Sequence, residues 1–130
     1  MNALSAAVLQ EISTRDLAFL EMQDRYENLS AIHDIWPIVA KRFGKTVALN
    51  DPHGQPPATL TYEELAEAIK CFATGLQALG AETRCHVALF ADNSHRWLIA
   101  DQGIMTAGGM NAVRSATADP EELLYIAQNS

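Results

Sequence analysis

The residues RCHVALFADNSHRWLIADQGIMTAGGMNAVRS, from Arg84 to Ser115, read as strand, loop, helix and strand, and the other predicted elements flank this unit. The apolar run His86–Phe90 suits a strand that is buried on both faces. Ser94, or Asn93 before it, can cap a helix that begins near His95. Apolar residues at spacings of three and four predict that this helix is largely buried: Trp97, Ala100, Ile104 and Ala107.

A second strand follows this helix. Gly108-Gly109 supplies the positive backbone angle that ends a helix, and Met110–Val113 is again short and apolar. Two strands joined by a crossover helix in one sheet are predicted to be parallel, which gives an α/β fold built from a βαβ unit. Ligands of open α/β sheets bind at the carboxyl ends of the strands, here Ala91–Ser94 and Arg114–Thr117.

Further elements flank this unit. The clearest is a helix over Tyr62–Leu79, because apolar residues recur along it and Thr61 and Glu64 form a capping box. Its small residues Ala66, Ala73 and Gly75 predict close packing against another element. The remaining predictions are a helix over 32–43 that ends at Gly44, a small hairpin of strands 47–50 and 58–61, and a helix that opens at Pro120.

The amino-terminal signals are weaker. Met1–Ile12 fits a short helix and Ser13–Glu27 a second one with a thin apolar stripe. We therefore expect residues 1–30 to form a peripheral helical segment and residues 31–130 to form the opening of an α/β domain. In a βαβα series the next element is a strand, and its absence before residue 130 predicts an incomplete, truncated sheet.

Composition excludes several classes of protein. With 130 residues, 48% of them hydrophobic, the chain is long and apolar enough for one core. Nine basic and sixteen acidic residues give a net charge of -7 without a basic stripe, so we expect no nucleic-acid partner. Two cysteines and the lack of a secretion signal predict a reduced, cytoplasmic protein, and no apolar window is long enough for a transmembrane segment.

The candidate phosphate-binding motifs each lack a required residue. Gly44-Lys45-Thr46 resembles the end of a P-loop, but Val39 stands where that loop requires a glycine. Gly103 and Gly108 have the correct interval, yet Gly109-Met110 replaces the required Lys and Ser or Thr. No GxGxxG fingerprint occurs either, so the sequence predicts no phosphate cradle in this chain.

The candidate metal ligands favour a structural interpretation. The cysteines and histidines have no ligand-pair spacing, and the adjacent Cys85 and His86 point to opposite faces of a strand. The pair His33-Asp34 is more typical of a helix start than of a metal dyad. We interpret this set as packing and surface residues: Cys71, Cys85, His86 and His95.

Two further residues stand out. Trp97 could stack on a base or an adenine, but its position on the inner stripe of a buried helix favours core packing. Arg114 lies just after a strand, where ligands gather, and we favour for it an ion pair with Asp119 or Glu122. We therefore assign no catalytic, cofactor-binding or metal-binding residue.

One series of motifs carries a family resemblance. Asn93-Ser94-x-x-Trp97-x-x-Ala100-Asp101 is followed by Ala107-Gly108-x-x-Asn111-Ala112-Val113-Arg114 and then by Glu121-Glu122-Leu123. This series resembles the amino-terminal portion of the AMP-forming acyl-CoA synthetase (adenylate-forming) superfamily. Arg114-Ser115 stands where most members carry a proline and a hydrophobic residue. With Asp101–Met105, it is similar to the long-chain fatty-acid acyl-acyl carrier protein synthetases and acyl-CoA synthetases of cyanobacterial and plastid type.

The resemblance implies a parent ligase that uses ATP and magnesium to convert a fatty acid to an acyl-adenylate and then to a thioester. Its partners would be the fatty acid, ATP, acyl carrier protein or coenzyme A, and the remainder of the parent domain. The sequence leaves the thiol and the acyl length open, and also whether the cytoplasmic parent lies peripherally at a membrane surface. The family's phosphate loop, magnesium contacts and carboxy-terminal lysine lie beyond Ser130, so we expect the isolated chain to be inactive and to hold no cofactor.

One alternative comes from a different class of protein. The chain could be a stand-alone, non-catalytic α/β interaction or regulatory module. Such a domain is expected to be monodisperse and to unfold cooperatively, whereas a fragment with an open strand edge is expected to aggregate.

Overall fold

A computed structural model describes residues 29–129 of the chain, which divides into two compact units, Met1–Ile35 and Trp36–Ser130. In the first unit, Asp34 Oδ2 accepts hydrogen bonds from the backbone N–H groups of Ser30 and Ala31 at 3.0 and 2.9 Å. These bonds accompany a single 3-10 turn, η1 (Ile32–Asp34). The helices expected within 1–27 lie outside the described residues, as does almost all of the proposed segment 1–30.

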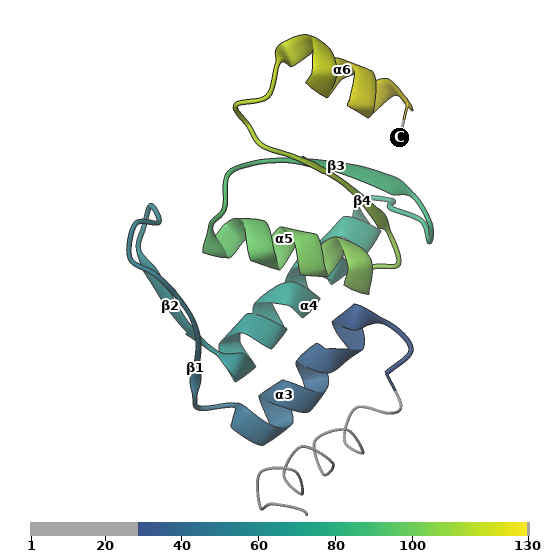
Figure 1. The fold of residues 1–130 in the computed structure, drawn as a ribbon. Helices are drawn as coiled ribbons and strands as arrows, with labels where there is room; N and C mark the ends of the chain where they lie inside the picture. Colours follow the sequence, from purple (N-terminus) through teal and green to yellow (C-terminus); the bar gives the residue numbers. More distant parts are fainter. Residues whose placement is uncertain (1–28, 130) are drawn as a thin grey trace, which may run out of the picture. The chain divides into compact units, whose positions relative to one another are not determined.

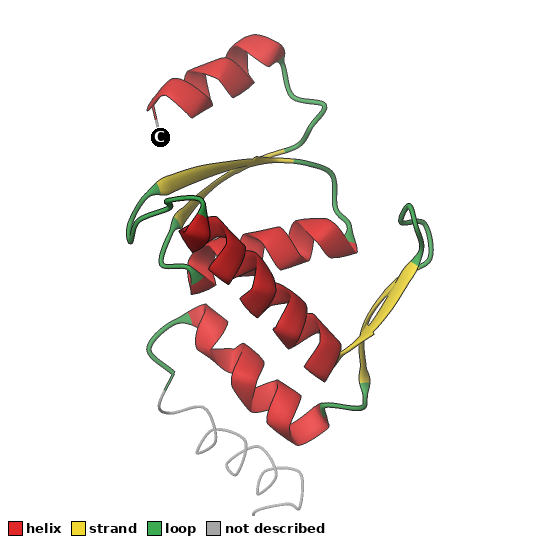
Figure 2. Cartoon of the chain, turned by 180° about the vertical axis from the view of Figure 1, so that it is seen from behind, coloured by secondary structure: helices red, strands yellow, loops and turns green. Residues whose placement is uncertain are grey.

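The second unit has the α/β arrangement expected from the sequence (Figures 1 and 2). The helix expected over 32–43 is α-helical only from Ile35 onward, after the 3-10 turn. No helix within residues 29–129 is long and apolar enough to cross a membrane. The elements in chain order are α3 (Ile35–Phe43), β1 (Val47–Asp51), β2 (Ala58–Thr61), α4 (Tyr62–Ala78), β3 (His86–Phe90), α5 (His95–Thr106), β4 (Met110–Arg114) and α6 (Pro120–Asn129).

The predicted hairpin and capping box are both confirmed. Strands β1 and β2 pair antiparallel, with Asp51 opposite Ala58. The Thr61 hydroxyl accepts a hydrogen bond from the Glu64 backbone N–H at 3.3 Å, and the Glu64 carboxylate accepts one from the Thr61 backbone N–H at 2.9 Å. This reciprocal pair satisfies two N–H groups that a helix start leaves without partners, so α4 begins directly at the end of β2.

Strands β3 and β4 pair in parallel, as the sequence predicts, with Val87 opposite Asn111 and Phe90 opposite Arg114. Helices α5 and α6 lie on opposite sides of this pair (Figures 1 and 2). Gly108, with a φ of 87°, follows the end of α5. It returns the chain toward β4, because few other residues adopt that angle without strain.

The core of the second unit lies mainly between α4 and α5. Leu65 and Ile69 of α4 and Ile104 of α5 are each 1% exposed. Gly103 of α5 allows the close approach of the two helices, since a Cβ there would lie 2.5 Å from Phe72 Cδ1. The sequence placed this close approach partly at Gly75, and that was wrong: a Cβ at Gly75 would meet nothing within 4 Å.

Burial differs from the sequence-based expectation at two further places. Strand β3 was expected to be buried on both faces, but His86 and Ala88, which share one face, are exposed. Leu79, which continues the apolar stripe of α4, is 87% exposed. The burial expected for α5 holds for its second half, where Ala100, Gln102, Gly103 and Ile104 are buried. Only Arg96 and Thr106 of this helix are exposed. Some apolar side chains that the sequence pattern predicts to be buried are therefore exposed within residues 29–129.

Candidate functional site

The carboxyl ends of β3 and β4 meet at one edge, where the sequence placed the candidate ligand region. The Ala91 N–H donates to the Arg114 carbonyl at 3.3 Å, which extends the strand pairing by one residue. Beyond that point the Ser115 hydroxyl donates to Asp92 Oδ1 at 3.3 Å, and the Thr117 N–H donates to Ser115 Oγ at 3.2 Å. The two loops are thus held side by side by hydrogen bonds.

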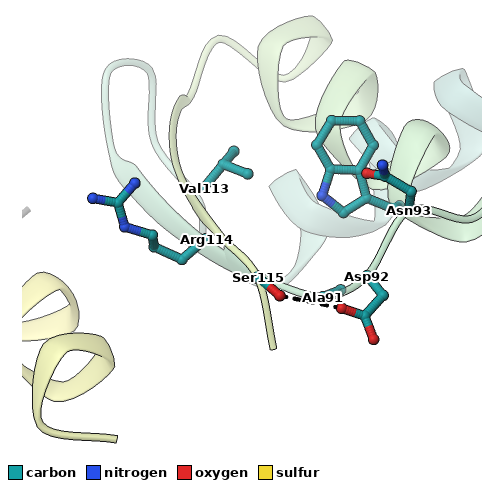
Figure 3. Close-up of a pocket in the computed structure, with 7 residues that line it drawn as sticks. Ala91, Asp92, Asn93, Val113, Arg114 and Ser115 are labelled. Atoms are coloured by element: carbon teal, nitrogen blue, oxygen red, sulfur yellow. Dashed lines mark hydrogen bonds between the residues drawn. The ribbon is translucent and has the colours of Figure 1, made fainter. Parts of the chain in front are cut away.

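A hollow of about 480 Å³ opens at this edge (Figure 3). Asp92, Asn93 and Ser115 give it a polar side. Its full lining is Ala91, Asp92, Asn93, Trp97, Val113, Arg114 and Ser115.

The arginine of this hollow is paired. Arg114 Nε donates to Glu122 Oε1 of α6 at 2.7 Å, one of the two ion pairs favoured from the sequence. In Figure 3 the Arg114 side chain extends away from Asp92 and Asn93. Arg114 therefore ties β4 to α6, and its position gives no support for a ligand-binding role.

A second hollow, of about 490 Å³, lies on the α4 side of the same loop. It shares Ala91, Asp92, Asn93 and Trp97 with the first. Its other lining residues are Phe72 of α4, Leu89 of β3, and Ser94, Arg96 and Ala100 at the start of α5. The wall that α4, β3 and α5 contribute is mainly apolar.

Trp97 lines both hollows. The sequence placed Trp97 in the core. In residues 29–129 it is only half-buried, and the buried part of α5 begins one turn later, at Ala100. The Ser94 hydroxyl accepts a hydrogen bond from the Trp97 N–H at 3.1 Å, which confirms the predicted helix cap.

The structure also contains a polar cluster that the sequence reasoning missed. His95 Nδ1 and Asp51 Oδ2 are 2.8 Å apart, and the His95 backbone N–H donates to the same oxygen at 3.0 Å. The two side chains are 12% and 16% exposed. A Cβ at Gly54 would lie 2.6 Å from that oxygen, so only glycine fits beside the carboxylate.

These contacts have an electrostatic consequence. The pKa of Asp51 lies below its ordinary value, first because the His95 backbone N–H bonds to the carboxylate and then because the imidazole does. The cluster joins the hairpin to the first turn of α5. The two residues are 44 positions apart, and Asp51 directly follows the predicted strand 47–50, so no local pattern could have found the pair.

A second polar chain runs from α3 to β4. Trp36 Nε1 donates to Gln102 Oε1 at 2.7 Å, and Gln102 Nε2 donates to Asp101 Oδ2 at 2.9 Å. Asn111 Nδ2 donates to the Asp101 carbonyl at 3.0 Å and also to its carboxylate. Gln102 is 8% exposed, so these bonds supply partners that a buried amide requires. Three elements are joined by this chain of contacts.

The described residues do not fit an ATP–magnesium site. Residues 29–129 contain no group of three or more His, Cys, Asp or Glu side chains that could hold a metal ion. Cys71 and Cys85 are both free, and Cys71 is exposed. The distance from His33 Nε2 to Asp34 Oδ1 is 3.9 Å. Neither hollow has a glycine in its lining that could form a phosphate loop.

Solved structures of adenylate-forming proteins share this fold. A fatty acid AMP ligase from Legionella pneumophila superposes with a TM-score of 0.66 at 24% identity, covering 79% of this chain and 18% of that one. The amino-terminal subdomain of NpsA from Klebsiella oxytoca, in complex with 3-hydroxyanthranilyl-AMSN, gives a TM-score of 0.69 at 24% identity. This match covers 77% of this chain and 25% of that one. At these identities the likeness concerns the fold alone.

Relatives with curated descriptions are closer in sequence. A chloroplastic long-chain-fatty-acid–[acyl-carrier-protein] ligase of Arabidopsis thaliana, AEE15, is 47% identical over 106 residues, which are 82% of this chain and 15% of the relative. The long-chain-fatty-acid–CoA ligase ACSBG2 of Xenopus laevis is 32% identical over 98 residues, 75% of this chain and 13% of the relative. The chain thus spans about one seventh of the length of these relatives. Residues 37–130 match the family described as AMP-binding enzyme, and the chain belongs to that family.

Proposed function

We propose that this chain is the opening part of the AMP-binding domain of an ATP-dependent long-chain fatty-acid ligase. The observation that carries the proposal is the 47% identity with an acyl carrier protein ligase over 106 residues. The reaction of the parent would join a fatty acid to AMP and then transfer the acyl group to a thiol. Acyl carrier protein is the acceptor we favour, because the more similar relative is named for it.

We further propose that residues 29–129 contribute structure and not catalytic groups. Adenylation needs a preorganised cradle for the ATP phosphates and a magnesium ion to neutralise their charge. The ion and its ligands, the phosphate loop and the adenine contacts would be supplied by the remainder of the parent domain. The free cysteines agree with a reducing compartment, and we propose a cytoplasmic location for the parent.

Exchange of radiolabelled pyrophosphate into ATP tests this proposal. The purified 130-residue chain is expected to show no fatty-acid-dependent exchange and no ATP affinity by calorimetry. A polypeptide that continues the reading frame through the rest of the domain is expected to show both. Fatty-acid-dependent exchange by the short chain alone, or none by the longer polypeptide, would contradict the proposal.

A further inference from the structure

The four asparagines of residues 29–129 differ in how firmly their side chains are held. Asn93 is exposed, and its side-chain amide makes no hydrogen bond within these residues. In Figure 3 the hydrogen bond drawn at this edge joins Ser115 to Asp92 and leaves the Asn93 amide alone. The other three side chains each bond to a second residue: Asn50 to Thr59, Asn111 to Asp101 and Asn129 to Tyr125.

The backbone nitrogen that follows Asn93 is also free. Asn93 and Ser94 lie between β3 and α5, and the Ser94 N–H makes no hydrogen bond within residues 29–129. By contrast, Asn50 and Asn111 lie within paired strands, whose ladders hold the main chain on both sides of each residue. The side chain of serine is small and leaves the nitrogen of Ser94 open to attack the neighbouring amide.

These two features meet the requirements of succinimide formation. The Ser94 nitrogen loses its proton to solvent and attacks Cγ of Asn93. A bond from Cγ to that nitrogen forms, the bond from Cγ to the side-chain nitrogen breaks, and the latter leaves as ammonia. Water then opens the ring on either side. One product is aspartate with an unchanged main chain, and the other is isoaspartate, in which the main chain runs through Cγ.

We propose that Asn93 is a site of spontaneous covalent modification, which deamidates in the folded chain faster than the other asparagines of residues 29–129. Asn93 lines both hollows, so each product places a second negative charge beside Asp92. Isoaspartate also lengthens the main chain by one atom directly before Ser94, which caps α5. The reaction needs only water, and it is therefore independent of the proposed ligase function.

Peptide mapping by mass spectrometry tests the site in the 130-residue chain. The folded chain is kept in mildly alkaline buffer, which favours loss of the Ser94 proton, and is then digested in acid. The peptide with Asn93 is expected to convert from amide to acid several times faster than the peptides with Asn50, Asn111 or Asn129. Equal or faster conversion at one of those three positions, or none at Asn93, would overturn the proposal.

Unfolding in urea separates the effect of the fold from that of the local sequence. Asn129 is the matched comparison, because serine follows it as it follows Asn93, but Asn129 is part of α6. The two rates are expected to differ in the folded chain and to approach each other in urea. A ratio of rates that urea leaves unchanged would show that the fold has no part in the selectivity.

Enzymatic labelling supplies an independent readout. A purified isoaspartyl methyltransferase with labelled S-adenosylmethionine is expected to mark the peptide that contains residue 93. Asn93→Gln should remove this label, because the longer side chain must close a larger ring, which forms much more slowly. Asn129→Gln is the control and should leave the label unchanged, and circular dichroism checks that both variants are folded. A label that persists in the Asn93→Gln peptide would assign the reaction to Asp92 and overturn the site.

Discussion

At the scale of single residues, the two glycines of the helix pair are a direct test of how α4 and α5 pack. Gly103→Ala would put a Cβ 2.5 Å from Phe72 Cδ1 and 3.1 Å from its Cβ, so the helices must move apart. We expect a loss of about 1 to 3 kcal/mol in the free energy of unfolding, measured by urea denaturation. Gly75→Ala is the control, because its Cβ would meet nothing. That change should stabilise the chain by up to about 1 kcal/mol, and a matching loss at both positions would refute the packing described.

The Asp51–His95 contact predicts a dependence of stability on pH. The pKa of Asp51 is lowered in the folded chain, so its ionised carboxylate stabilises the fold above the unfolded-state pKa of about 3.8. This contribution is lost as the pH falls through the lower folded-state pKa. Asp51→Asn should therefore be less stable than the wild type at neutral pH, and its stability should fall less steeply in acid.

The measurement is urea denaturation at a series of pH values between neutrality and the acid limit of folding. Glu82→Gln removes the same charge from an exposed loop and is expected to leave the acid dependence close to that of the wild type. Identical acid profiles for the wild type and Asp51→Asn would show that the contact with His95 contributes nothing.

The candidate site shows where residue-level prediction stops. The sequence located the strand ends and the Arg114 ion pair, because both follow from local order along the chain. It could not find the Asp51–His95 pair or the second hollow, since these join elements that lie far apart in sequence. The sequence analysis also placed Trp97 in the core, but Trp97 lines an open hollow. A helical pattern shows which face of a helix is apolar and not which other elements cover that face.

At the scale of elements, the contact from Trp36 to Gln102 joins α3 to α5. Trp36→Phe keeps most of the aromatic ring but leaves Gln102 Oε1 without its 2.7 Å donor in a site that is 8% exposed. Leaving a buried polar group unsatisfied costs about 1 to 3 kcal/mol. Trp97→Phe is the matched control, because its ring lines open hollows and should cost less.

Chemical denaturation followed by far-ultraviolet circular dichroism compares the two variants without relying on tryptophan fluorescence. A greater loss for Trp97→Phe would instead agree with the core position that its helical pattern indicates.

Helix boundaries that carry a capping residue or a glycine were predicted correctly. Thr61 and Ser94 cap the starts of α4 and α5, and Gly108 follows the end of α5. The start of α3 has no such signal, and the first turn is 3-10 instead of α-helical.

At the scale of the whole molecule, the apolar residues of the sequence exceed those that the described fold buries. Strands β3 and β4 pair only with each other within residues 29–129, so each has an open edge there. Met110 of β4 is 39% exposed, and Leu124 and Tyr125 of α6 are 58% and 67% exposed. The sequence correctly predicted a parallel α/β sheet. The burial predicted for both faces of β3 is not reached within residues 29–129, where His86 and Ala88 are exposed.

These open edges predict self-association of the isolated chain. Sedimentation velocity over a range of concentrations should show the wild type forming larger species as its concentration rises, because unpaired strand edges pair with one another. Met110→Lys places a charge at the start of β4, which should suppress this association. Leu79→Lys changes a residue that is 87% exposed at the C-cap of α4, outside either strand, and should have little effect. A wild-type chain that stays monodisperse and melts in one sharp transition would instead support the stand-alone module, because a domain selected to act alone must bury its own strand edges.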